Sequence, residues 1–90
     1  MDHLADVARI EILHVPDCPF VGPVRETVMR ALARADLTAV LRERVGDYPS
    51  PTLLVDGIDV TGQTPAPGAY CRLDLPTEVQ VLAALRSNGW

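Results

Sequence analysis

Apolar and polar residues along the chain follow two different periods, and the first segment has the short period of a strand. Residues 9–15, RIEILHV, carry apolar side chains at both alternating sets of positions, Ile10 and Ile12 in one and Leu13 and Val15 in the other. A strand that is apolar on both sides is typical of a central position in a sheet with both faces covered. The segment therefore predicts a central strand that is buried on both sides.

Apolar residues three and four positions apart predict the first helix, over residues 22–35. The apolar positions are Val21, Val24, Val28, Leu32 and Ala35. Two interpretations of the helix start are open. In one, Cys18 caps the helix and Pro19 lies in its first turn. In the other, Gly22 is the cap and Pro23 is the first helical residue, which keeps a proline out of the helix interior.

The middle of the chain predicts a further strand and a hairpin. Residues 38–44, TAVLRER, are a strand candidate, although their Leu and Arg content also suits a helix. Residues 52–60, TLLVDGIDV, predict a β-hairpin that turns at Asp56 and Gly57. Residues 61–75 then form a long loop that is rich in Pro and Gly at its start.

Capping signals predict the last helix. Thr77 as N-cap and Gln80 three residues later have the spacing of a capping box, in which each side chain bonds the other residue's backbone amide. An apolar stripe and a terminal glycine complete the pattern: Val79, Leu82, Leu85 and Gly89. Residues 1–8 show weak periodicity, so we expect a loose N-terminal extension of one domain that spans residues 1–90.

The order strand, helix, strand, strand, strand, helix predicts an α/β domain with a mixed four-stranded sheet. A strand-helix-strand unit makes its two strands parallel through a right-handed crossover, and the hairpin adds two antiparallel strands. One helix on each face would bury such a sheet. The pattern therefore predicts a three-layer α/β/α arrangement.

Strand directions predict that the two cysteines, Cys18 and Cys71, belong to the same end of the sheet. Cys18 directly follows the first strand. The first hairpin strand runs antiparallel and begins at that end near Pro51, and the second returns to it near Val60. The loop with Cys71 leaves from there, so the thiols could pair if their Cα atoms approach within about 7 Å.

Composition narrows the classes of function. The chain has 90 residues, 48% of them hydrophobic, which suits one small domain with a single core. A formal net charge of −4 and only 8 Lys and Arg residues, without a basic cluster, argue against a nucleic-acid partner. No apolar run reaches the roughly 18 residues that span a bilayer, and no signal-peptide pattern appears, so we expect no membrane partner and a cytoplasmic location.

The arrangement resembles the thioredoxin-like superfamily in its minimal, glutaredoxin-like form. Cys18 lies between the first strand and the first helix, and SPT at residues 50–52 opens the hairpin, where that superfamily has a cis-proline. The runs SPTLLVDG and CRLDLPTE are also similar to short proteins often labelled alkylmercury lyase. Two features depart from the superfamily: Val21 replaces the second cysteine of CxxC, and the link VGDYPSP is too short for the usual intervening helix.

The resemblance and the strand directions together favour thiol-disulfide exchange, with Cys18 as the attacking thiolate and Cys71 as its partner. The resemblance implies that Pro51 is cis, holds a substrate backbone and shields the sulfur. The expected partner is a thiol or disulfide protein or a small thiol, and no cofactor is expected.

Two other classes of function stay open. In a soft-metal or organomercurial protein, Cys18 and Cys71 would bind the metal ion and Asp17 would deliver a proton to carbon. In a non-enzymatic domain, the fold would bind a partner through the same end without chemistry. His14, at the end of the first strand, is expected to be a packed side chain rather than a base.

Overall fold

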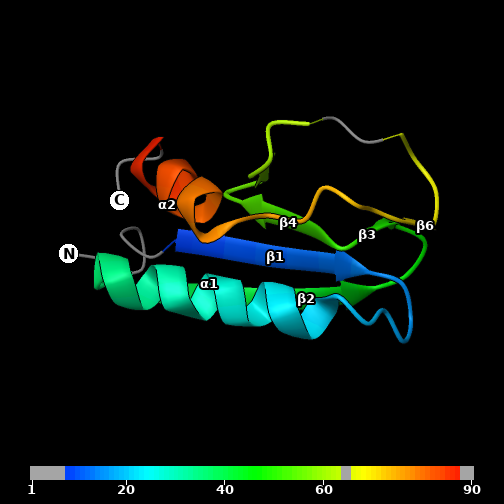
Figure 1. Cartoon of the computed structure of the whole chain (residues 1–90), viewed down its shortest axis with the longest axis horizontal. Coiled ribbons are helices and arrows are strands. Elements are labelled where there is room, and N and C mark those ends of the chain that lie inside the picture. The colour runs from blue at the N-terminus through cyan, green and yellow to red at the C-terminus, as the bar shows by residue number, and fades with distance from the viewer. Residues whose placement is uncertain (1–7, 64–65, 88–90) are drawn as a thin grey trace.

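The computed structural model describes residues 8–63 and 66–87, which form two helices and six strands (Figure 1). In chain order the elements are β1 (Ala8–His14), α1 (Val21–Ala35), β2 (Ala39–Val45), β3 (Pro49–Ser50), β4 (Thr52–Val55), β5 (Ile58–Asp59), β6 (Tyr70–Cys71) and α2 (Glu78–Ser87). Within these described ranges, no helix has both the length and the apolar character needed to cross a membrane. Residues 1–7 of the predicted extension lie outside the described residues, and Ala8 already belongs to β1.

Four strands form one mixed sheet in the order β2-β1-β4-β5. β1 is parallel to β2 and antiparallel to β4, and Ile12 lies between Glu43 on one side and Leu53 on the other. β4 and β5 are antiparallel. The prediction of an α/β chain with a mixed four-stranded sheet is therefore confirmed. The structure adds a short parallel pair, β3 with β6, that the sequence pattern did not predict.

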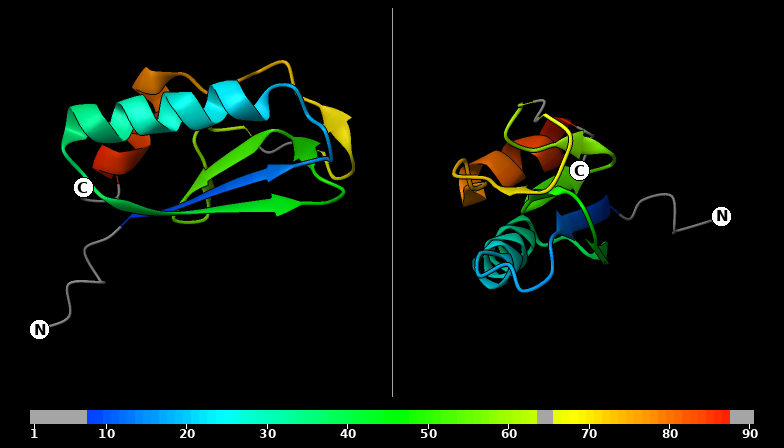
Figure 2. Two further views of the ribbon diagram at one scale, coloured as in Figure 1. Left: turned by 90° about the horizontal axis from the view of Figure 1, so that it is seen from below. Right: turned by 90° about the vertical axis from the view of Figure 1, so that its right-hand side faces the viewer.

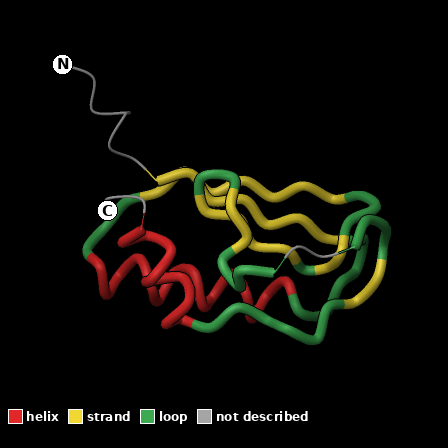
Figure 3. The backbone as a smooth tube through the Cα atoms, turned by 90° about the horizontal axis from the view of Figure 1, so that it is seen from above, coloured by secondary structure: helices red, strands yellow, loops and turns green. Residues whose placement is uncertain are grey.

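Both helices lie on the same face of the sheet, as Figure 2 and Figure 3 show, so the predicted three-layer arrangement was wrong. The two helices contact each other directly, and Arg34 Nη1 of α1 lies 2.7 Å from Glu78 Oε2 of α2. A helix for the opposite face would have to lie between β2 and β4. Only residues 46–51 connect those strands, and they include β3. The described chain therefore has one layer of helices and one of strands.

The core lies between the helix layer and the sheet. Ile10 and Ile12 of β1 are fully buried on the helix side, whereas Leu13 on the opposite side is only partly covered. The prediction that this strand is buried on both faces was wrong, because no described helix covers the second face. The other buried apolar residues of the core are Ala8, Val21, Val24, Val28, Ala31, Leu32, Leu53, Val55, Val81 and Leu85.

Helix α1 begins at neither of the two predicted positions. Its N-cap is Phe20, without a side-chain hydrogen bond, and Val21 is its first residue. Pro23 is the third helical residue and needs no acceptor, because the first four backbone N–H groups of a helix have no partner within it. The first backbone bond of the helix runs from the Val24 N–H to the Phe20 carbonyl at 3.1 Å. Pro23 is thus accommodated without the hydrogen-bond loss that favoured a later start.

The hairpin turn agrees with its prediction. Asp56 and Gly57 have positive φ angles of 50° and 86°, the conformation that two-residue hairpin turns of type I′ require. Asp and Gly tolerate this region better than other residues do. Local turn chemistry therefore connects β4 and β5 at the predicted position, although β5 ends at Asp59 rather than at residue 60.

The capping box of α2 is also confirmed, but the predicted apolar stripe is partly wrong. The Gln80 N–H donates to Thr77 Oγ1 at 3.1 Å, and the Thr77 N–H donates to Gln80 Oε1 at 2.9 Å. Val81 and Leu85 face the core, whereas Val79 is 73% exposed. Gly89 lies outside the described residues.

Candidate thiol site

The segments that carry the two cysteines lie at the same end of the sheet. Figure 1 and Figure 2 show the β1–α1 loop and β6 together beyond the carboxyl end of β1. Cys18 belongs to that loop and Cys71 to β6. The strand directions deduced from the sequence predicted this juxtaposition of segments.

Ser50 connects the backbone of both segments. Its side-chain Oγ accepts a hydrogen bond from the Val15 N–H at 3.2 Å, three residues before Cys18. Ser50 is also the direct partner of Cys71 in the parallel β3–β6 pair, and its carbonyl accepts the Arg72 N–H at 2.7 Å. Ser50 is fully buried. One fixed residue therefore sets the position of the chain on both sides of the candidate site.

The two cysteines have different surroundings, and both are free thiols. Cys18 is half-buried and packs against the core, and its carbonyl lies 3.5 Å from the Val21 nitrogen at the start of α1. Cys71 is exposed. Val21, where a CxxC motif would have its second cysteine, is buried in the core at 5% exposure. A thiol at that position would be covered, whereas Cys71 is accessible.

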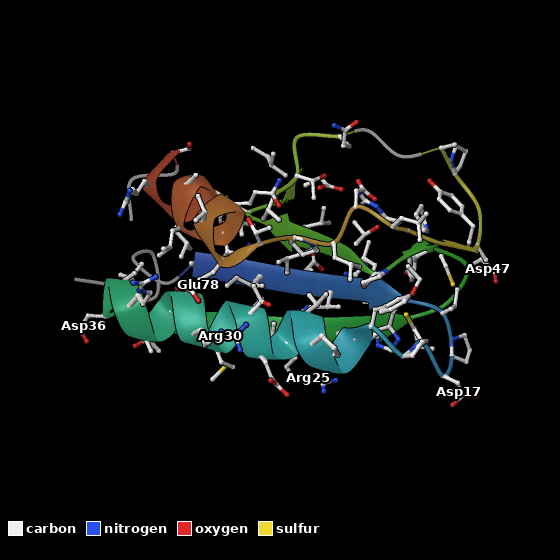
Figure 4. All side chains as sticks on the ribbon, in the orientation of Figure 1. Asp17, Arg25, Arg30, Asp36, Asp47 and Glu78 are labelled. Carbon is white, nitrogen blue, oxygen red and sulfur yellow. The ribbon has the colours of Figure 1, made fainter. Side chains whose placement is uncertain are left out.

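The other two predicted site residues occupy opposite environments. Pro51 is buried directly after Ser50, and the Ser50–Pro51 peptide bond is cis, as the resemblance implied. Asp17 is exposed at the tip of the β1–α1 loop and points away from the body of the molecule (Figure 4). Its φ of 60° lies in the left-handed region, which Asp tolerates better than most residues. The tip position therefore accounts for an aspartate without any chemical role.

Arg72, directly after Cys71, is the main residue of this region that the sequence interpretation missed. Its side chain is 2% exposed, and its guanidinium pairs with Asp59 at 2.7 Å and with Asp74. It also donates to Thr52 Oγ1 at 3.2 Å and Thr61 Oγ1 at 3.1 Å. Buried charges in proteins are paired. The only signal in the sequence for a buried Arg72 was therefore Asp74, a possible ion-pair partner two residues later in the same loop.

The ion pair changes the acidity of its members. Hydrogen bonds from the Arg72 guanidinium hold the pKa of the Asp74 carboxyl below its ordinary value. The same bonds to Asp74, with those to Asp59, raise the pKa of Arg72 against the effect of burial. Asp74 is therefore a poor proton donor.

We expect the Asp74 ion pair to stabilise the fold at neutral pH and to be lost in acid. Because the folded pKa is lowered, the contribution is complete above the ordinary carboxyl value of about 3.9 and disappears as the pH falls through the lower native value. Urea unfolding of wild type and Asp74→Asn between neutral and acidic pH measures this. The difference in stability between the two proteins should shrink in acid. A difference that is independent of pH would contradict it.

His14 is packed, as predicted, and belongs to a network on the helix side of the sheet. Its Nδ1 lies 2.9 Å from the Val15 carbonyl, and its Nε2 lies 3.4 Å from Glu43 Oε1 without hydrogen-bond geometry. Glu43 receives two hydrogen bonds from Arg25, at 2.7 and 2.8 Å, which lower the pKa of its carboxyl. Arg25 is therefore the main partner of Glu43, and His14 lies beside the same carboxylate.

The described residues contain no group of three or more His, Cys, Asp and Glu side chains that could hold a metal ion. Two thiolates can bind a soft ion by themselves, since thiolate ligands favour soft metals. A site of this kind would have to be formed by Cys18 and Cys71.

No known family model matches the chain, and no curated protein is significantly similar to it.

Proposed function

We propose that the chain is a small thioredoxin-like thiol protein that carries out thiol-disulfide exchange through Cys18, with Cys71 as its resolving partner. The observation that carries the proposal is the position of Ser50, which bonds the Cys18 loop through its side chain and pairs with Cys71 in register. Paired strands lie about 4.8 Å apart, so Cys71 is one strand spacing from a residue bonded to the Cys18 loop.

The arrangement of the sheet supports the thioredoxin-like part of the proposal. A parallel β1–α1–β2 unit is followed by an antiparallel hairpin in the order β2-β1-β4-β5, and the first cysteine lies between β1 and α1. Both helices pack on one face, which agrees with the loss of the helix that would follow β2. The chain retains the elements that place a thiol at the end of β1.

The proposed reaction has two steps. The Cys18 thiolate attacks one sulfur of a substrate disulfide, the substrate S–S bond breaks, and the departing sulfur takes a proton, which leaves a mixed disulfide. The Cys71 thiolate then attacks Cys18 Sγ and releases the second substrate thiol. The substrate disulfide is reduced by two electrons, and the protein dithiol is oxidised to a Cys18–Cys71 disulfide. A small thiol or a dithiol protein would return the protein to its reduced form.

The surroundings of the two cysteines fit these separate roles. Cys18 is half-buried against the core and is held by the start of α1, which suits a thiol that must be presented in one geometry. Cys71 is exposed on a strand of two residues within a long loop. A short strand in a loop can move toward Cys18, as closure of a disulfide would require.

Oxidation by glutathione disulfide tests the proposed function. We expect the reduced monomer to lose two hydrogen atoms and to yield, on proteolysis, a Cys18 peptide linked to a Cys71 peptide. The matched control, Cys71→Ser, should stop at a glutathione adduct on Cys18. Separate adducts on both cysteines of the wild-type protein, with no internal disulfide, would contradict the proposal.

The same variants separate the soft-metal alternative. Tight binding of one mercury(II) ion by wild type that is lost in Cys71→Ser, without formation of an internal disulfide, would support a two-thiol metal site instead. Absence of both properties would support a domain that binds a partner without thiol chemistry.

A further inference from the structure

We propose that Arg72 is a positioning residue that holds Cys71 beside Ser50 and so determines how readily Cys71 forms a disulfide with Cys18. This role rests on the proposed function. Arg72 follows Cys71 directly in the sequence. Within residues 66–74, Arg72 is buried and all the other residues are exposed.

All five N–H donors of the guanidinium are occupied by protein acceptors. Nε donates to Asp74 Oδ1 at 3.0 Å, Nη1 donates to Asp59 Oδ2 and Thr52 Oγ1, and Nη2 donates to Asp74 Oδ2 and Thr61 Oγ1. An arginine side chain has five donors and no acceptor. No donor is therefore left for a substrate anion, which favours a role in holding the chain over a role in binding a ligand.

The partners of Arg72 come from separate segments. Thr52 begins β4, Asp59 ends β5, Thr61 follows that strand, and Asp74 belongs to the segment that leads to α2. Asp59 is itself fixed, because its Oδ1 accepts the Thr61 N–H at 2.8 Å and the Thr61 hydroxyl at 2.6 Å. The side chain thus attaches the Cys71 segment to the edge of the main sheet.

The residues around Cys71 provide little other support. Residues 66–71 are all exposed, so their side chains add little packing to hold this part of the loop. The backbone bond from the Arg72 N–H to the Ser50 carbonyl, at 2.7 Å, lies one residue from Cys71. Loss of the Arg72 side chain would free a segment whose order depends on few contacts. The effective concentration of Cys71 at Cys18 would then fall.

The charges explain why arginine is needed at this position. Asp59 and Asp74 are the two carboxylates at the guanidinium, and they lie thirteen residues before and two residues after Arg72 in the sequence. A bidentate, planar cation can bond both carboxylates and both hydroxyls at once, whereas a lysine ammonium has three donors. Lysine at this position should therefore restore the position of Cys71 only in part.

The test measures the equilibrium of the Cys18–Cys71 disulfide in glutathione redox buffers for wild type, Arg72→Met, Arg72→Lys and Asp74→Asn. We expect the equilibrium constant for disulfide formation to fall by about tenfold in Arg72→Met and less in the other two, since effective concentration depends on how closely the segment is held. The rate of Cys18 alkylation, measured in a Cys71→Ser background, should stay the same. If Arg72 only stabilised the fold as a whole, its replacement would change the disulfide equilibrium and the rate of Cys18 alkylation together.

Glu78→Gln is the matched control, because it weakens an ion pair of similar length between the helices, away from the thiols. It should leave the disulfide equilibrium unchanged. If Arg72→Met does not fold, Asp74→Asn decides the question, since the Asp74 side chain is 46% exposed and its replacement leaves the Asp59 pair intact. If the Arg72 and Asp74 variants fold and have the wild-type equilibrium constant for disulfide formation, the proposed role of Arg72 is wrong, and the proposed function is not affected. A wild-type protein without the internal disulfide would overturn the proposed function as well.

Discussion

The Cys71→Ser variant is expected to accumulate a mixed disulfide between Cys18 and a substrate thiol, whereas Cys18→Ser should form none. On the proposed function, Cys18 makes the first attack and Cys71 releases the substrate, so removal of Cys71 blocks only the second step. Loss of the attacking thiol should reduce exchange by more than about a hundredfold, as removal of a nucleophile generally does. Mass spectrometry of the quenched reaction, together with the rate of reduction of a small disulfide, measures both effects.

The assignment of the two roles depends on the difference between these variants. Cys71 is exposed, so alkylating reagents can reach it whatever its function. The informative result is the trapped species in Cys71→Ser. Wild-type exchange by Cys18→Ser would show that Cys71 acts alone and would contradict the assignment of Cys18 as the attacking thiol.

Replacement of Ile12 by alanine should cause a large loss of stability. Ile12 is fully buried on the central strand β1, between β2 and β4 and beneath the helices. Truncation of a buried isoleucine to alanine removes apolar contacts and leaves a cavity, at a cost of about 2–5 kcal/mol. Urea unfolding monitored by circular dichroism measures this difference in the free energy of unfolding.

Val40→Ala is the matched control for that experiment. Val40 belongs to the edge strand β2 and is 46% exposed, so its truncation should change the free energy of unfolding by less than about 1 kcal/mol. Equal losses in the two variants would contradict the assignment of the core to the helix side of the sheet.

Local patterns predicted the two helices and the strands of the main sheet, and long-range packing determined the features that these patterns do not contain. The Asp56–Gly57 turn and the Thr77–Gln80 capping box follow from interactions within a few residues, and both were predicted. The face on which α2 packs depends on contacts with α1 that no local pattern contains. The same limit explains why Val79 was assigned to the buried stripe, although Val81 faces the core.

The candidate site shows a similar division. Chain order and strand direction brought the segments of Cys18 and Cys71 to one end of the sheet. Arg72 was missed because its burial depends on Asp59, thirteen residues earlier in the chain, and on hydroxyls from two other segments. An arginine in a loop is ordinarily solvated, and only the folded arrangement of these acceptors makes it a buried residue.

A crystal structure of the reduced protein tests the central claim most directly, through the positions of Cys18 and Cys71. We predict that their Cα atoms lie within about 7 Å of each other, or reach that separation by movement of the β6 segment alone, because a disulfide requires this approach. Sulfur atoms that face apart on two well-ordered segments, with no change of the β6 segment in the oxidised protein, would contradict the account.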